Sequence, residues 1–194
     1  MRSVTIAALA GLAVLAAAAP ASAQTQMQPY AGLQTRDIKA LSAQEMVDLT
    51  AGRGMSLALP AELNGYPGPK HVLEFADQLG LTERQRAEVK RLFDSMESEA
   101  IPLGRELIAA ERTLDRDFAE RTVTPERLKA ATAAIGEIRG NLRNAHLKYH
   151  LATAALLSQD QIGRYAELRG YHATAVDTGA PAGQAGSAPH GHSH

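Results

Sequence analysis

Apolar residues recur between positions 128 and 156 at alternating spacings of three and four residues, without an exception. They are Leu128, Ala131, Ile135, Ile138, Leu142, Ala145, Tyr149, Ala152 and Leu156. This spacing matches the 3.6-residue period of an α-helix and predicts one long helix with a single buried face. A similar stripe over 82–119 predicts a second long helix. Because the connection near 119–124 is short, we expect the two helices to be antiparallel neighbours.

Composition supports an all-α fold. The chain of 194 residues has no Cys and no Trp, and only three Phe and five Tyr. Disulfides, Cys-ligated zinc and a thiol nucleophile are therefore excluded. We predict a bowed antiparallel hairpin of long helices with short flanking helices, because Pro102 interrupts the hydrogen bonding of the first long helix and favours a bend there.

The first residues have the pattern of a secretory leader. Arg2 precedes an uncharged, Ala-rich stretch that ends at Pro20, and a small-x-small pattern ends at Ala23. We expect cleavage after Ala23, so that 1–23 is a signal peptide; an uncleaved anchor is the alternative. We expect a flexible segment over 24–41, a helical domain over 42–172 and a disordered, His-containing tail over 173–194.

Shorter helices flank the long pair. Ser42 and Glu45 have the spacing of a capping box, which predicts a helix over 42–52. A second short helix is expected over 69–79, closed by Gly80, and a third over 158–171. The passage 60–69 between the first two is rich in Pro and Gly, which argue against continuous helix there.

One short motif marks both ends of the long hairpin. Leu-Thr-Glu-Arg-Gln begins at Leu81, and Leu-Ser-Gln-Asp-Gln begins at Leu157. In each copy a hydroxyl caps the helix start, a Gln three residues later reaches back, and the preceding Leu packs inward. The six residues concerned are Leu81, Thr82, Gln85, Leu157, Ser158 and Gln161.

The paired motifs resemble those of the Spy/CpxP family of bacterial periplasmic proteins, which is named for L-T-x-x-Q; Ser158 replaces the usual Thr. The resemblance covers about 69–171. It implies a helical hairpin that forms a homodimeric, thin, curved cradle in the periplasm. The family includes an ATP-independent chaperone, an envelope-stress regulator and zinc- or nickel-responsive relatives described as heavy-metal sensors. It also implies that the six motif residues are structural.

Basic residues follow a heptad spacing on the first long helix, opposite its buried stripe. They are Arg84, Arg91, Arg105 and Arg112. A solvated helix face is one interpretation. The other is a client-binding face, since guanidinium groups and their methylene stems offer weak, adaptable contacts to unfolded proteins.

Histidines are the candidate metal ligands. His146 and His150 lie one helical turn apart and flank the buried stripe, so they form either two surface imidazoles or a metal pair. The chain ends with three further imidazoles, at His190, His192 and His194, which have the chemistry to bind zinc, copper or nickel weakly. No cofactor is required by the sequence.

The second long helix has few charges opposite its buried stripe. The small or apolar residues there are Ala133, Ala134, Gly140, Leu147, Ala154 and Ala155. Either the 42–79 region covers this face, or the face is a dimer seam or a client surface.

The function expected from these features is an ATP-independent periplasmic chaperone or envelope-stress protein that binds unfolded or misfolded periplasmic proteins. The alternative is a periplasmic protein that binds or senses a heavy metal through the His tail; a regulator that docks on a membrane sensor kinase is a third. We expect no enzyme, because no phosphate loop, nucleophile elbow or paired catalytic carboxylates are found. The net charge of −1 does not favour nucleic acid as a partner.

Overall fold

The computed structural model describes residues 28–171, and every regular element in that range is helical. The chain divides into two compact units after Gln34. Residues 29–32 form turns that lead into the short 3-10 helix η1 (Leu33–Thr35), and helices α1 to α6 all belong to the second unit. An all-α fold with long helices is therefore confirmed for the described residues.

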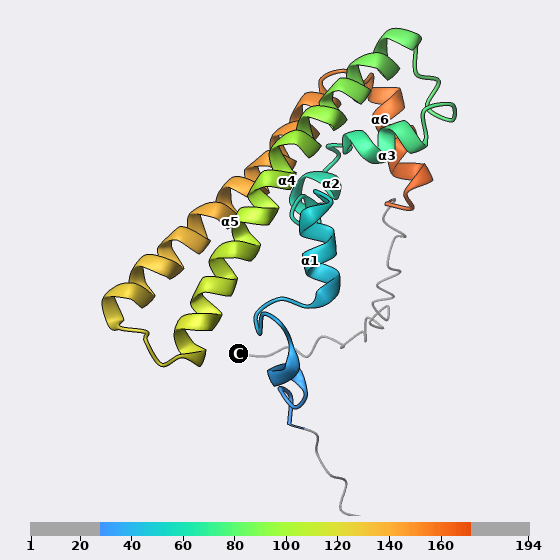
Figure 1. Cartoon of the computed structure of the whole chain (residues 1–194). Coiled ribbons are helices and arrows are strands. Elements are labelled where there is room, and N and C mark those ends of the chain that lie inside the picture. The colour runs from blue at the N-terminus through green and yellow to red at the C-terminus, as the bar shows by residue number, and fades with distance from the viewer. Residues whose placement is uncertain (1–27, 172–194) are drawn as a thin grey trace, which may run out of the picture. The chain divides into compact units, whose positions relative to one another are not determined.

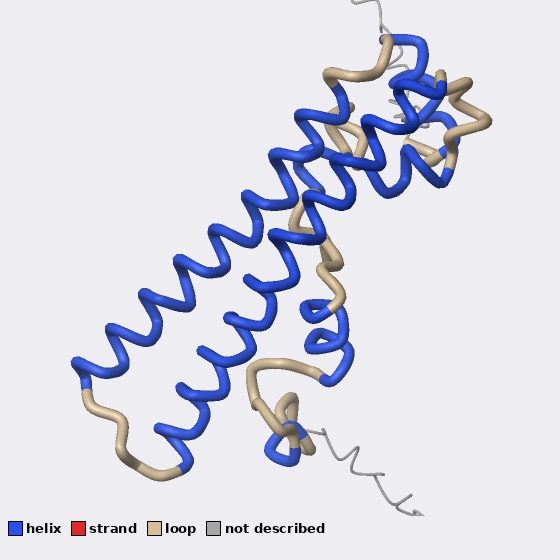
Figure 2. Tube along the Cα trace, turned by 45° about the horizontal axis from the view of Figure 1, so that its top comes forward, coloured by secondary structure: helices blue, strands red, loops and turns tan. Residues whose placement is uncertain are grey.

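Two long helices dominate the second unit. Helices α4 (Glu83–Ala119) and α5 (Pro125–Ala154) lie side by side and run in opposite directions (Figures 1 and 2). Helix α4 continues through Pro102, and α5 begins with a Thr124 cap and Pro125 in its first turn. The bounds lie within two residues of the helices expected from the apolar stripes.

The short helices differ more from expectation. Helices α1 (Ala43–Thr50) and α6 (Gln159–Leu168) occupy the expected positions, and the capping box of Ser42 and Glu45 is present. Helix α3 (Pro69–Glu74) is shorter than predicted, because turns replace it before Gly80. The one-turn helix α2 (Leu59–Glu62) overlaps the start of the 60–69 passage, where no continuous helix was expected; Pro60 is tolerated because it stands in the first turn.

Buried apolar side chains form two separate clusters. The first joins α1, α4 and α5, and its buried members are Ile38, Leu41, Leu49, Ala100, Leu107, Ile108, Ile135, Ile138 and Leu142. The second joins α3, the start of α4 and α6, and its buried members are Val72, Ala76, Leu79, Leu81, Val89, Leu157 and Tyr165. Each cluster buries the inner faces of amphipathic helices, which is the main stabilising term of such a fold.

The segment expected to be flexible over 24–41 is packed at its end. Ile38 and Leu41 are buried in the first cluster, and Lys39 bonds Asp115 of α4 through both its backbone N–H and its ammonium group. These last residues are therefore packed, because two well-spaced apolar side chains suffice to anchor a short, aperiodic stretch; the flexibility expected of the segment stays a prediction.

A glycine lets α1 approach α4 closely. A Cβ atom added at Gly104 would lie 2.2 Å from the carbonyl oxygen of Leu49, at the end of α1. Gly52 then turns the chain away with a φ of 65°, a left-handed conformation that favours glycine. The position of α1 thus depends on the missing side chain at Gly104.

No helix in the described range 28–171 is both long enough and apolar enough to span a membrane. The expected leader over 1–23 lies outside that range, as does the expected tail over 173–194.

We predict that Gly104→Ala destabilises the fold, because the new methyl group meets a backbone carbonyl that cannot move independently. The expected loss is about 1–3 kcal/mol in the free energy of unfolding. Gly136→Ala is the matched control: Gly136 lies in α5 with no atom near its Cβ position, so the better helix former should stabilise by up to about 1 kcal/mol. Urea unfolding followed by circular dichroism measures both. Equal stability of the two variants would contradict the close approach.

Candidate functional site

Both L-[ST]-x-x-Q motifs form the capping boxes expected from the sequence. The Thr82 hydroxyl accepts from the backbone N–H of Gln85, and the Gln85 side chain accepts from the N–H of Thr82. Ser158 and Gln161 repeat this arrangement at the start of α6. Leu81 and Leu157 are both buried in the second cluster.

The two motifs also bond to each other, which sequence reasoning missed. The Gln85 side-chain amide donates to Oε1 of Gln161 at 2.9 Å, and the Gln161 amide donates to Oε1 of Gln85 at 3.2 Å. Their remaining N–H groups donate to the backbone carbonyls of Leu156 and Leu79, respectively. Both amides are thus fully engaged, and they tie the start of α4 to the start of α6. The sequence signal that could have indicated this contact is the repetition of the motif at Leu81 and Leu157.

All four arginines of the heptad series on α4 are exposed. Arg91 pairs with Glu88 one turn earlier, and Arg112 bonds Asp37 at 3.1 Å. Among the described residues, neither Arg84 nor Arg105 has an ion-pair partner. These two guanidinium groups are therefore free to contact another molecule.

The outer face of α5 is largely uncovered in the described unit. Helices α1 and α3 pack mainly against α4; among the short helices, α2 and part of α3 contact α5, and α1 meets the inner side of α5 in the first apolar cluster. Ala133, Ala134, Gly140 and Ala155 are exposed, while Leu147 and Ala154 are half-buried. Leu151, on the same face, is 57% exposed. The 42–79 region therefore does not cover this face as a whole.

His146 and His150 are buried, so the interpretation of them as two surface imidazoles is wrong. Their exposed fractions are 2% and 8%. The segment 51–68 crosses over both rings: a Cβ at Gly54 would lie 3.6 Å from His146 Nδ1, and one at Gly68 would lie 2.7 Å from His150 Cε1. Gly68 is the sequence signal that could have indicated the burial of His150, since its missing side chain allows backbone to lie on the ring, whereas a Cβ at Gly54 would make only ordinary contact with His146.

The two rings have different hydrogen bonding. His150 Nδ1 donates to the carbonyl oxygen of Tyr66 at 2.7 Å and lies 3.7 Å from Oε2 of Glu62. His146 Nε2 is buried without a hydrogen-bond partner. Burial, and secondarily the nearby His150, lowers the pKa of His146 below its ordinary value. His146 is therefore held in its neutral form.

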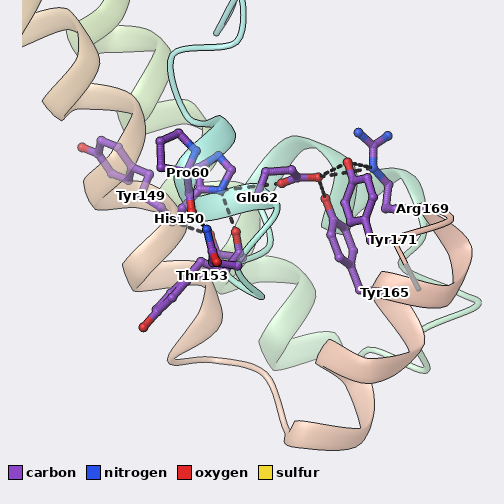
Figure 3. Close-up of polar contacts among 10 residues, drawn as sticks. Pro60, Glu62, Tyr149, His150, Thr153, Tyr165, Arg169 and Tyr171 are labelled. Atoms are coloured by element: carbon purple, nitrogen blue, oxygen red, sulfur yellow. Dashed lines mark hydrogen bonds and ion pairs between the residues drawn. The ribbon is translucent and has the colours of Figure 1, made fainter. Parts of the chain in front are cut away.

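Glu62 is the centre of a buried polar network (Figure 3). It is 8% exposed, and its Oε1 accepts from the hydroxyls of Tyr165 and Tyr171 at 2.5 and 2.9 Å, with Arg169 Nε 3.3 Å away. Burial and the bond to Glu62 raise the pKa of Tyr165 above its usual range. The network joins α2 to α6 and to the residues that follow it. Sequence periodicity gave no sign of it.

A cleft of about 490 Å³ lies beside this network. Its walls include the loop after α1, α2 and the start of α3, and its apolar lining includes Phe93 and Met96 of α4 together with Met55. His146, His150 and Glu62 also line it. The cleft is therefore lined on one side by the 51–68 segment and on the other by α4 and α5.

A metal centre is not assembled in the described range, where no group of three His, Asp or Glu side chains is placed to hold an ion. Both His146 and His150 instead pack beneath the 51–68 segment, and we assign them to packing. His190, His192 and His194 lie outside the described residues.

Comparisons of the chain with protein-family models, curated proteins and solved structures give no match.

We predict that Tyr165→Phe destabilises the fold by about 1.5–3 kcal/mol, the range for a hydrogen bond to a charged group, because Glu62 loses a buried donor. Tyr66→Phe is the matched control, since Tyr66 is exposed and only its backbone carbonyl is used. Thermal unfolding followed by circular dichroism compares them. If Tyr165→Phe unfolds at the temperature of Tyr66→Phe, the network carries no stability.

Proposed function

We propose that the chain is an exported, ATP-independent chaperone of the Spy/CpxP type that acts in the periplasm. The observation that carries this proposal is the uncovered, weakly charged outer face of α5, where Ala133, Gly140 and Leu151 are exposed. Exposed small and apolar residues on one side of a folded helix are a feature of surfaces that bind other proteins. Unfolded clients offer the complementary apolar segments.

The free arginines extend this surface in the proposal. Arg84 and Arg105 lie on α4 with no ion-pair partner in the described range, and their methylene stems can contact apolar groups while the guanidinium heads stay in water. Contacts of this kind are weak and adaptable. They suit a chaperone that releases its clients without nucleotide hydrolysis.

The finer architecture is part of the same proposal. A bow at Pro102 would curve the pair of long helices, and two copies would form a cradle with a concave face. The missing N–H of Pro102 leaves the Ser98 carbonyl without its intrahelical donor, which supports the bow. The leader pattern over 1–23 supports export.

We predict that the chain lacking residues 1–23 suppresses the aggregation of a denatured client, measured by light scattering. The double variant Ala133→Glu/Leu151→Glu places two charges on the α5 outer face and should lose at least about half of this suppression, because apolar contact is removed. Thr132→Glu/Asn141→Glu adds the same charge at exposed positions on the flanks of α5 and should retain it.

The outcomes separate the alternatives. Absence of suppression by the unsubstituted chain, or equal loss in both double variants, contradicts the proposal. Suppression that requires both zinc and the residues after Tyr171 supports instead the metal-binding function expected of the His tail.

A further inference from the structure

The segment 51–68 is held on α5 by two histidines whose chemistry differs. Backbone at Gly54 lies against His146, and backbone at Gly68 lies against His150. At Gly68 the contact is too close for a Cβ atom, at Gly54 a Cβ atom would make ordinary contact, and both rings are buried. The segment therefore stays in place only while neither ring becomes an unpaired buried cation.

Oxygen atoms that can accept a hydrogen bond lie near His150 Nδ1, whereas His146 Nε2 has no such partner. The carbonyl oxygen of Tyr66 and Oε2 of Glu62 both lie near His150 Nδ1. His146 Nε2 is buried without a partner, and among the groups that shift the pKa of His146 there is no carboxylate. A second proton on His146 would thus create a buried, unpaired cation, which is among the most destabilising groups in a protein interior.

The other charged and titratable groups around the cleft do not compensate such a charge. The acids that line it are Glu62 and Glu97. The basic and other titratable groups are Arg53, Lys70, His71, His150, Arg169 and Tyr171. Glu62 accepts from two tyrosines through Oε1 and lies beside Arg169, while its Oε2, which has no hydrogen-bond partner, lies 3.7 Å from His150 Nδ1. Cations and imidazoles outnumber the acids at this site.

We propose that protonation of His146 releases the segment 51–68 from α5 at mildly acidic pH, while α4 and α5 stay paired. Release is opposed by the buried Ala61 and Pro67 and by the bonds of Glu62 to Tyr165 and Tyr171, whereas the rest of the segment is weakly held. Its only helix, α2, has one turn, and Leu59, Leu63 and Tyr66 are exposed rather than buried. Segments with few buried contacts open at lower free energy than the core.

The direction of the pH effect follows from the sign of the shift. The pKa of His146 is lower in the closed state than in water, so the open state binds the proton more readily. Stability of the closed state is complete above about pH 6.5, the ordinary value for His, and falls as the pH drops below it. Opening uncovers Phe93 and Met96; that this enlarges a client-binding surface rests on the proposed function, whereas the opening itself does not.

Amide hydrogen exchange of the full chain, corrected for intrinsic rates, tests the opening at pH 7.5 and pH 5.0. Protection within 51–68 should fall by at least about tenfold at pH 5.0, while the centres of α4 and α5 keep theirs. His146→Phe and His146→Gln, which cannot be protonated, should remove this pH dependence. His71→Gln is the matched control, because His71 lines the same cleft but pairs with Glu74 at its edge.

Three results would overturn the proposal. The first is unchanged protection of 51–68 between the two pH values. The second is loss of protection throughout α4 and α5, which indicates global unfolding. The third is a pH dependence that survives in both His146 variants but disappears in His150→Gln. None of these results depends on chaperone activity, so failure of this inference is distinguishable from failure of the proposed function.

Discussion

The reciprocal amide pair of Gln85 and Gln161 is the constraint on which the placement of the helices depends. Each amide caps its own helix, bonds the other amide, and donates to a backbone carbonyl that lies just before the other helix. A local capping motif thereby becomes a long-range contact over 76 residues. With the starts of α4 and α6 fixed together, Leu81 and Leu157 are both directed into the second apolar cluster.

The polar network around Glu62 lies beyond this corner and has a different role. Burying a carboxylate costs free energy unless donors surround it, and here two tyrosines and Arg169 do so. Oε2 of Glu62 and Nε2 of His146 are nevertheless both buried without a hydrogen-bond partner, so the same region also holds two unsatisfied polar atoms. We infer that these two atoms weaken the attachment of the 51–68 segment.

Local sequence signals predicted what is local in the structure. The two apolar stripes gave α4 and α5, and the capping boxes gave the starts of α1, α4 and α6. Burial of His146 and His150 was missed, because helical periodicity describes one helix and cannot foresee that a Pro- and Gly-rich segment lies across it. Leu128 fits the stripe yet is exposed, since α5 begins where nothing else packs against it. The burial of the two histidines and the exposure of Leu128 both depend on which distant segments contact α5.

A double-mutant cycle on Gln85 and Gln161 tests the central claim most directly. Gln85→Ala and Gln161→Ala each remove a cap, so the information lies in the coupling between them, measured by urea unfolding. The account predicts a coupling free energy of at least about 1 kcal/mol, as for side chains in one hydrogen-bonded network. Glu45→Ala, which removes the similar cap of α1, combined with Gln85→Ala should be additive. Additivity of the Gln85 and Gln161 variants within about 0.3 kcal/mol would contradict the account.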